Sequence, residues 1–133
     1  MPAVQYYVAL VARPRRAVLL VDDDVAIREA LAEGLVDEGF PVHAAQNGRE
    51  ALDWLQKNGD RPCVVLLDLM MPVMDGRTFL GIRGADPSLS KIPVIVVSAD
   101  SGCFELTKTH DVRVVLHKPI VWEGLVAAIQ ECD

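Results

Sequence analysis

The chain has 133 residues, 51% of them hydrophobic and 24% charged, which is the size and balance of one globular domain. The formal net charge of −6 disfavours direct binding to nucleic-acid phosphates, and no apolar run is long enough to insert into a membrane. Three cysteines, an odd number without Cys-x-x-Cys spacing, argue against a disulfide framework or a zinc site and favour a reducing cytoplasm.

Residues 1–16 are expected to form an N-terminal extension of unclear role. Val4–Ala12 is apolar and is followed by Arg13, Arg15 and Arg16, whereas a secretory signal peptide carries its positive charges before the apolar run. One interpretation is that the segment is a simple extension of the domain, the remnant of a tag or the product of an upstream translation start. The alternative is an added strand or packing segment, because this apolar stretch suits a strand and would be sticky if exposed.

From residue 17 onward, short apolar runs alternate with helical patterns. Strands are expected at residues 17–21, 41–45, 63–67, 93–97 and 112–116. Helical patterns follow at residues 27–35, 51–55, 79–83, 105–109 and 121–129. Such alternation predicts an α/β domain over residues 17–133, with a doubly wound, five-stranded parallel sheet covered by helices on both faces. Right-handed crossovers favour the strand order 2-1-3-4-5.

The first helical pattern has one apolar face. It is formed by Ile27, Ala30, Leu31, Gly34 and Leu35. Asp24 directly precedes this pattern and is expected to cap the helix through its side chain. Gly39 is expected to end the helix, because glycine readily adopts the conformation that follows a last helical turn.

Polar residues follow the predicted strands at their carboxyl ends. They are Asp22 and Asp23 after the first, Asp68 after the third, Ser98 after the fourth and Lys118 after the fifth. Ligands bind outside these ends in an open parallel sheet, so the side chains should converge. Clustered carboxylates disfavour one another's ionisation unless a cation lies between them, and a few such oxygens suit Mg²⁺ better than Ca²⁺.

This set predicts a phosphoryl site in which a central carboxylate, Asp68, is the nucleophile and forms an acyl phosphate. Mg²⁺, the Ser98 hydroxyl and the Lys118 amine would share the charge of the transferring oxygens. The alternative is a satisfied polar cluster without function, although buried unpaired carboxylates are costly.

Five motifs around these residues occur in one order and spacing. They are V-L-L-V-D-D-D-x-x-x-R (Val18–Arg28), G-F-P-V-x-x-A-x-N-G-x-E-A-L (Gly39–Leu52), L-L-D-L-M-M-P-V-M-D-G (Leu66–Gly76), I-P-V-I-V-V-S-A (Ile92–Ala99) and H-K-P (His117–Pro119). From Ala17 to about Glu131 the chain resembles the response-regulator receiver domains of two-component signalling, which have a flavodoxin-like fold. The resemblance implies a phosphoacceptor that signals by a conformational change.

The resemblance assigns the acidic residues to metal binding and phosphorylation. Asp68 matches the phosphoacceptor, and Asp22 and Asp23 match the pair that binds Mg²⁺ directly or through water. Met70 matches the position whose backbone carbonyl is a further metal ligand. The resemblance also implies a histidine kinase or phosphotransfer protein as donor and a downstream protein as partner. The chain would promote its own phosphorylation and dephosphorylation without being an enzyme.

Three further positions match the family's phosphoryl contacts and backbone. Ser98 matches the hydroxyl residue that hydrogen-bonds the phosphoryl group, Lys118 matches the lysine that pairs with it, and Pro119 matches the usual cis peptide. Two features depart from the family. Val115 replaces the usual aromatic residue three positions before the lysine, and the chain between Ser98 and Lys118 is short, with a polar helical pattern. Both fall on the usual output surface and indicate an unusual signalling route.

These departures motivate an alternative function, a protein-interaction module that acts without phosphorylation. An aspartate-nucleophile phosphatase is disfavoured, since Met70 stands where such enzymes place a second aspartate. A nucleotide or flavin site is disfavoured because the first strand leads into aspartates rather than a glycine-rich loop. The histidines, the tryptophans and the methionines after Asp68 are interpreted mainly as packing or surface residues.

Overall fold

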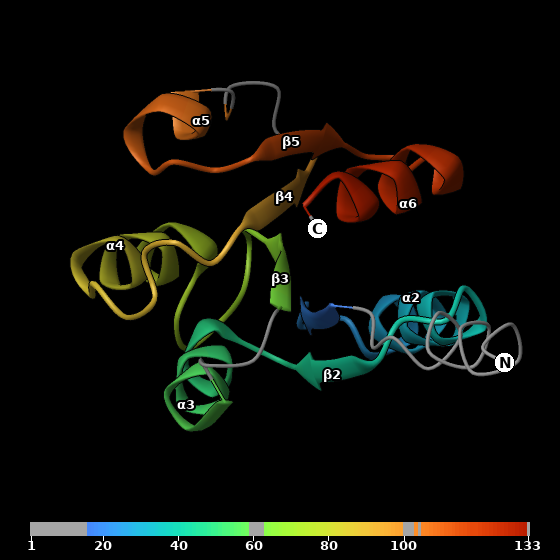
Figure 1. Ribbon diagram of the computed structural model, residues 1–133, viewed down its shortest axis with the longest axis horizontal. Coiled ribbons are helices and arrows are strands. Elements are labelled where there is room, and N and C mark those ends of the chain that lie inside the picture. Colours follow the sequence, from blue (N-terminus) through green and yellow to red (C-terminus); the bar gives the residue numbers. More distant parts are fainter. Residues whose placement is uncertain (1–15, 59–62, 100–102, 104, 133) are drawn as a thin grey trace, which may run out of the picture.

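The computed structural model describes residues 16–58, 63–99, 103 and 105–132 (Figure 1). The interpretation of residues 1–16 therefore lies outside the described residues, except at Arg16. The strands are β1 (Ala17–Val21), β2 (Val42–Ala45), β3 (Cys63–Asp68), β4 (Val94–Ser98) and β5 (Val114–His117). The helices are α2 (Val25–Asp37), α3 (Gly48–Asn58), α4 (Gly76–Ala85), α5 (Leu106–Thr109) and α6 (Trp122–Glu131).

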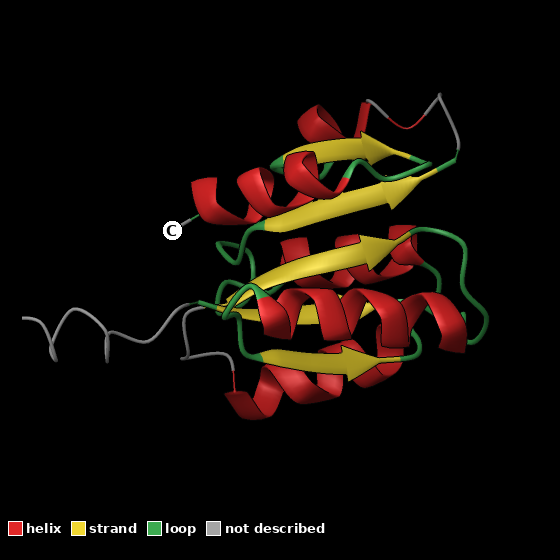
Figure 2. Ribbon diagram, turned by 90° about the vertical axis from the view of Figure 1, so that its right-hand side faces the viewer, coloured by secondary structure: helices red, strands yellow, loops and turns green. Residues whose placement is uncertain are grey.

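The strands form one parallel sheet in the order β2-β1-β3-β4-β5, which confirms the predicted fold and order. Figure 2 shows the strand arrows running in the same direction, with helices on both sides of the sheet. The register pairs Val21 with Leu67 and Leu67 with Val96, so the central strands end at nearly the same level. The residues that follow these strands are thereby brought to one edge of the sheet.

Two apolar layers enclose the sheet because successive side chains of a strand point to opposite faces. On β1, Leu19 belongs to the layer under α3, α4 and α5, whereas Leu20 belongs to the layer under α2 and α6. All six residues of β3 are buried, as expected for a central strand covered on both sides. Among the described residues, no helix is long and apolar enough to span a membrane.

Aspartate side chains cap the first turns of α2 and α4, and a glycine follows the last turn of α2. The Asp24 carboxylate accepts a hydrogen bond from the Ile27 backbone N–H at 3.2 Å, which confirms Asp24 as the cap of α2. Gly39 has φ = 96°, a conformation that most residues avoid, and it ends α2 as predicted. Asp75 caps α4 in the same way as Asp24 caps α2, accepting from the Thr78 N–H at 2.8 Å.

Some local predictions were wrong. Ala30 was placed on the apolar face of the first helix but is exposed, because that face is narrower than the pattern suggested. Ile27, at the N-terminal end of the same face, is 38% exposed.

The weak helix expected at residues 105–109 is confirmed as a single turn, α5. Val115 packs against the apolar layer under α3 and α4 as a partly buried side chain.

Arg83 on α4 is a buried cation that the sequence pattern did not reveal. Its side chain is 2% exposed. Its Nη2 and Nε donate to the Ile92 carbonyl oxygen at 2.7 and 3.2 Å, and its Nη1 donates to the His110 carbonyl oxygen at 3.0 Å. Burial lowers the pKa of Arg83, an effect that the nearby Asp111 charge opposes. Arg83 thereby ties α4 to the segment before β4 and to the end of α5.

Candidate functional site

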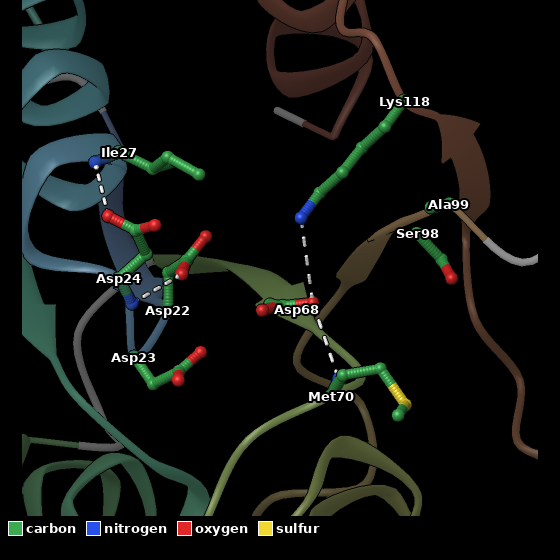
Figure 3. Close-up of a pocket in the computed structure, with 9 residues that line it drawn as sticks. All are labelled: Asp22, Asp23, Asp24, Ile27, Asp68, Met70, Ser98, Ala99 and Lys118. Carbon is green, nitrogen blue, oxygen red and sulfur yellow. Dashed lines mark hydrogen bonds and ion pairs between the residues drawn. The ribbon is translucent and has the colours of Figure 1, made fainter.

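The sheet brings four of the predicted site residues to one edge. Asp22 follows β1, Asp68 ends β3, and Ser98 ends β4 beside the end of β5, where Lys118 follows. Figure 3 shows the side chains of Asp22, Asp23 and Lys118 reaching from both sides toward Asp68. A cavity of about 610 Å³ lies between them. Its lining consists of Asp22, Asp23, Asp24, Ile27, Asp68, Met70, Ser98, Ala99 and Lys118.

The three carboxylates form a group that could hold a metal ion. One oxygen from each of Asp22, Asp23 and Asp68 lies within 4.8 Å of the others. Asp22 and Asp68 are buried, at 5% and 8% exposure, whereas Asp23 is exposed to the cavity side. Oxygen-only ligands with one open side are suited to a hard divalent cation that keeps some of its water. The residues present therefore fit the expected Mg²⁺.

Hydrogen bonds fix the orientation of the two buried carboxylates. Oδ1 of Asp22 accepts from the Asp24 N–H at 2.9 Å, and Oδ1 of Asp68 accepts from the Met70 N–H at 3.3 Å. The amine of Lys118 lies 3.8 Å from the same Asp68 oxygen. Arg28 Nη1 donates to the Asp22 carbonyl oxygen at 2.7 Å and so holds the backbone of the loop after β1.

Burial raises the pKa of both inner carboxyl groups. For Asp22, burial is the largest cause, and the charges of Asp68 and Asp23 add to it, against the opposing Asp24 N–H and the Lys118 charge. For Asp68, burial again comes first, opposed by the Met70 N–H and by Lys118, while Asp23 raises the pKa. The negative charges are therefore incompletely compensated by protein groups, and a bound cation would relieve them.

The remaining expected residues occupy the other side of the cavity. Ser98 is 2% exposed, and in Figure 3 its hydroxyl points away from the Asp68 carboxylate, so it would have to turn to reach a phosphoryl group there. The Lys118–Pro119 peptide bond is cis, as expected. The Met70 side chain is 78% exposed at the rim, and its backbone N–H is the part that contacts Asp68.

Sequence reasoning missed the contribution of Arg28 and Ile27 to this site. The sequence analysis gave Arg28 no role, although it is part of the first motif. Its position six residues after Asp22 does not indicate a hydrogen bond to the Asp22 carbonyl oxygen. Ile27 was placed on the apolar face of the first helix, and it lines the cavity as an apolar wall beside the acidic cluster. Both residues lie on the first turn of α2, which Asp24 anchors.

Comparison with known proteins agrees with this fold and site. The family model described as the response regulator receiver domain matches residues 18–130. "Response regulator MprA" of Mycolicibacterium vanbaalenii is 37% identical over 115 residues, covering 85% of this chain and 48% of that protein. "Probable transcriptional regulator ycf29" of Pyropia yezoensis is 37% identical over 94 residues, covering 70% of this chain and 41% of that protein. The chain thus spans about half the length of these relatives or less.

Comparison with solved structures also finds proteins with this fold. The chemotaxis response regulator CheY4 of Vibrio cholerae superposes with a TM-score of 0.78 at 30% identity, covering 90% of this chain and 100% of that one. A sensor protein from Polaromonas sp. JS666 superposes with a TM-score of 0.80 at 26% identity, covering 90% and 96% of the two chains. The chain belongs to the receiver domain family of the response regulators of two-component signalling.

Proposed function

We propose that Asp68 accepts a phosphoryl group from the phosphohistidine of a histidine kinase or phosphotransfer protein, and that the phosphorylated domain signals to a downstream protein. The observation that carries the proposal is the position of Asp68. Its buried carboxylate lies beside two further carboxylates on one side, with the Lys118 amine 3.8 Å away on the other. A carboxylate held between a cation-binding pair and a lysine is suited to carry a phosphoryl group with several charged oxygens.

The transfer requires only an exchange of bonds at phosphorus. An Asp68 carboxylate oxygen attacks the phosphorus atom, an O–P bond forms, the P–N bond to the donor imidazole breaks, and the imidazole leaves with the bonding electrons. The product is an acyl phosphate. Attack by water on the same phosphorus atom later releases inorganic phosphate and regenerates the carboxylate. The chain would therefore be phosphorylated and dephosphorylated without turning over an external substrate as an enzyme does.

Asp22, Asp23, Asp68 and the Met70 carbonyl would hold Mg²⁺ beside the phosphoryl oxygens. When bound, Mg²⁺ would neutralise part of the charge on these oxygens and on the carboxylates. Lys118 balances charge on the opposite side, and a Ser98 hydroxyl turned toward Asp68 would donate a hydrogen bond. The raised pKa values of Asp22 and Asp68 support this assignment, since both carboxylates lack full compensation from protein groups.

Net charge and thiol chemistry support a protein target and a cytoplasmic setting for the signal. The net charge of −6 supports a protein rather than a nucleic acid as the direct target. Cys63, Cys103 and Cys132 are buried thiols, which supports a reducing cytoplasm as the place of action.

The test is phosphorylation by acetyl phosphate with Mg²⁺, followed by intact mass. Wild type is expected to gain one phosphoryl group that alkaline hydroxylamine removes, and Asp68→Asn is expected to gain none. Asp75→Asn is the matched control, because Asp75 lies in the loop after β3 and asparagine caps a helix equally well. Labelling of Asp68→Asn at the wild-type level, or no labelling of wild type, would disprove the proposal.

A further inference from the structure

A second cavity lies on the outer side of the molecule, between α2 and the edge strand β2. Its volume is about 430 Å³, within the range of ligand-binding clefts. It is lined by Ala32, Glu33, Val36, Asp37, Val42 and Ala44. Val36 is 57% exposed, so its apolar side chain is open to solvent in this groove. We call this feature the α2–β2 groove.

The α2–β2 groove carries two acidic side chains, Glu33 and Asp37. Among the described residues, Glu33 and Asp37 form no ion pair and no side-chain hydrogen bond. Both lie in the second half of α2, whose last turn contains no basic residue. Carboxylates near a helix C-terminus are repelled by the helix dipole, so this end of α2 favours an approaching cation. The groove thus combines an apolar floor with a negative rim that no described cation pairs with.

The edge of the sheet beside the groove is also open. Within the described part of the chain, β2 pairs with β1 alone and is the last strand of the sheet. Val42 and Ala44 line the groove, while His43 between them stacks on Trp54 at the opposite face, with ring centroids 5.0 Å apart. Open sheet edges beside apolar surface are normally covered in native proteins.

We propose that the chain's own N-terminal segment covers the α2–β2 groove, with Val4–Ala12 on its apolar floor and Arg13 and Arg15 beside Glu33 and Asp37. The composition of the segment matches both features of the groove. Its apolar residues suit the apolar floor, and its arginines, which are nearest the domain, suit the negative rim. No other part of the sequence places an apolar stretch of this length beside clustered arginines. This inference is independent of phosphorylation at Asp68.

The path from β1 to the groove is short. The Val18 N–H donates to the Pro41 carbonyl oxygen at 2.8 Å, and Val18 pairs in register with Val42, which lines the groove. Strands lie about 4.8 Å apart, so the outer side of β2 is roughly 10 Å from β1. Residues 13–16 can span roughly 13 Å when extended, which is enough to carry the chain past β2. Tethering at this distance gives the segment a high effective concentration at the groove.

Nuclear Overhauser effects in the full chain test the proposal directly. The sequence contains two tyrosines, Tyr6 and Tyr7, so contacts from tyrosine ring protons identify the segment. We expect contacts from these rings to the methyl groups of Val36 and Val42. A sample mixing labelled and unlabelled chains distinguishes contacts within one molecule from contacts between two copies. Contacts found only between copies, or none at all, would overturn the proposal.

Charge reversal provides a second test with a matched control. In Glu33→Arg/Asp37→Arg, amide exchange of Val42–Ala45 should become roughly three- to tenfold faster, as expected for the loss of two exposed ion pairs. Combining this variant with Arg13→Glu/Arg15→Glu should restore the slow exchange. Glu131→Arg, in the last turn of α6, reverses one charge away from the groove and should leave these amides unchanged. If the combined variant does not restore slow exchange of these amides, the proposed ion pairs between the arginines and the groove carboxylates are contradicted.

Discussion

The indole of Trp122 lies directly over Gly34: a Cβ placed on Gly34 would be 2.5 Å from Cη2 of the Trp122 ring. The same indole donates a hydrogen bond from Nε1 to Oε1 of Glu38 at 3.2 Å. Trp122 begins α6, shortly after Lys118, whereas Gly34 lies in α2, the helix after Asp22 and Asp23. This contact therefore joins the helices that follow two opposite sides of the site.

Gly34→Ala should lower the free energy of unfolding by about 1–3 kcal/mol, because the new methyl group overlaps the Trp122 ring and overpacks the contact. This loss would outweigh the gain of up to about 1 kcal/mol that alanine brings inside a helix. Urea unfolding at neutral pH measures the difference. Gly124→Ala, in α6, is the control: its Cβ would meet no atom within 4 Å, so it should stabilise the protein. Stabilisation by both variants would contradict the packing described.

Neutralising a buried carboxylate should stabilise the metal-free protein. Asp22 and Asp68 have pKa values raised mainly by burial, so the fold favours their protonated forms. Their contribution to stability is therefore present at acid pH and is lost as pH rises through the raised pKa values. At neutral pH, in a chelator, Asp22→Asn and Asp68→Asn should melt at higher temperature than wild type.

The same melting experiment tests the metal site. Added Mg²⁺ should raise the melting temperature of wild type, since a ligand that binds only the folded state stabilises it. The two asparagine variants should respond much less. Asp53→Asn, an exposed change on α3, should behave as wild type in both conditions. An equal Mg²⁺ response in all four proteins would place the ion elsewhere.

Removal of the Asp75 cap should destabilise α4 in a pH-dependent manner. Asp75→Ala should cost about 1 kcal/mol at neutral pH, because the Thr78 N–H loses its acceptor. Hydrogen bonds from Thr78 hold the pKa of Asp75 below its ordinary value. The stabilisation is thus present above the unfolded-state pKa and disappears as pH falls through the folded-state value. Urea unfolding of wild type and Asp75→Ala should therefore converge at strongly acid pH and differ at neutral pH.

Arg83→Lys should destabilise the protein by about 2 kcal/mol, although the charge is kept. A single ammonium group cannot reach the Ile92 and His110 carbonyl oxygens with the geometry of the guanidinium, and a buried carbonyl group would lose its donor. Arg77→Lys is the matched control on the same helix. Arg77 pairs with Glu105 at the surface, at 3.3 Å, and its replacement should cost less than about 1 kcal/mol. Equal losses in chemical unfolding would show that the buried bonds of Arg83 contribute little.

The site was largely predictable because the positions of the strand ends determine where most of its residues lie. Once apolar runs such as Ala17–Val21 are recognised as parallel strands, Asp22 and Asp68 must lie at the same edge of the sheet. Asp24 was also predictable, since capping depends on a local contact with Ile27. The orientation of the Ser98 hydroxyl was not, because a side-chain rotamer depends on neighbours that no motif specifies.

Other features escaped the sequence because they depend on tertiary packing. Arg83 looked like a polar helix residue, but carbonyl groups from two distant segments make its burial favourable. Ala30 fitted the apolar period of α2, yet it is exposed, and Leu35 is the residue of this helix that is buried. The contact of Trp122 with Gly34 joins residues from opposite ends of the chain, which periodicity within either helix cannot reveal.

The strand order also determines when the site can exist during synthesis. Asp68 receives two neighbours, Asp22 and Asp23, from the loop after β1 and another, Lys118, from the loop after β5. A ribosome must therefore have released the chain through β5 before the complete set of charges can assemble around Asp68. A nascent chain that ends earlier carries the aspartates without the lysine, so the complete charged cluster forms only with the last strand.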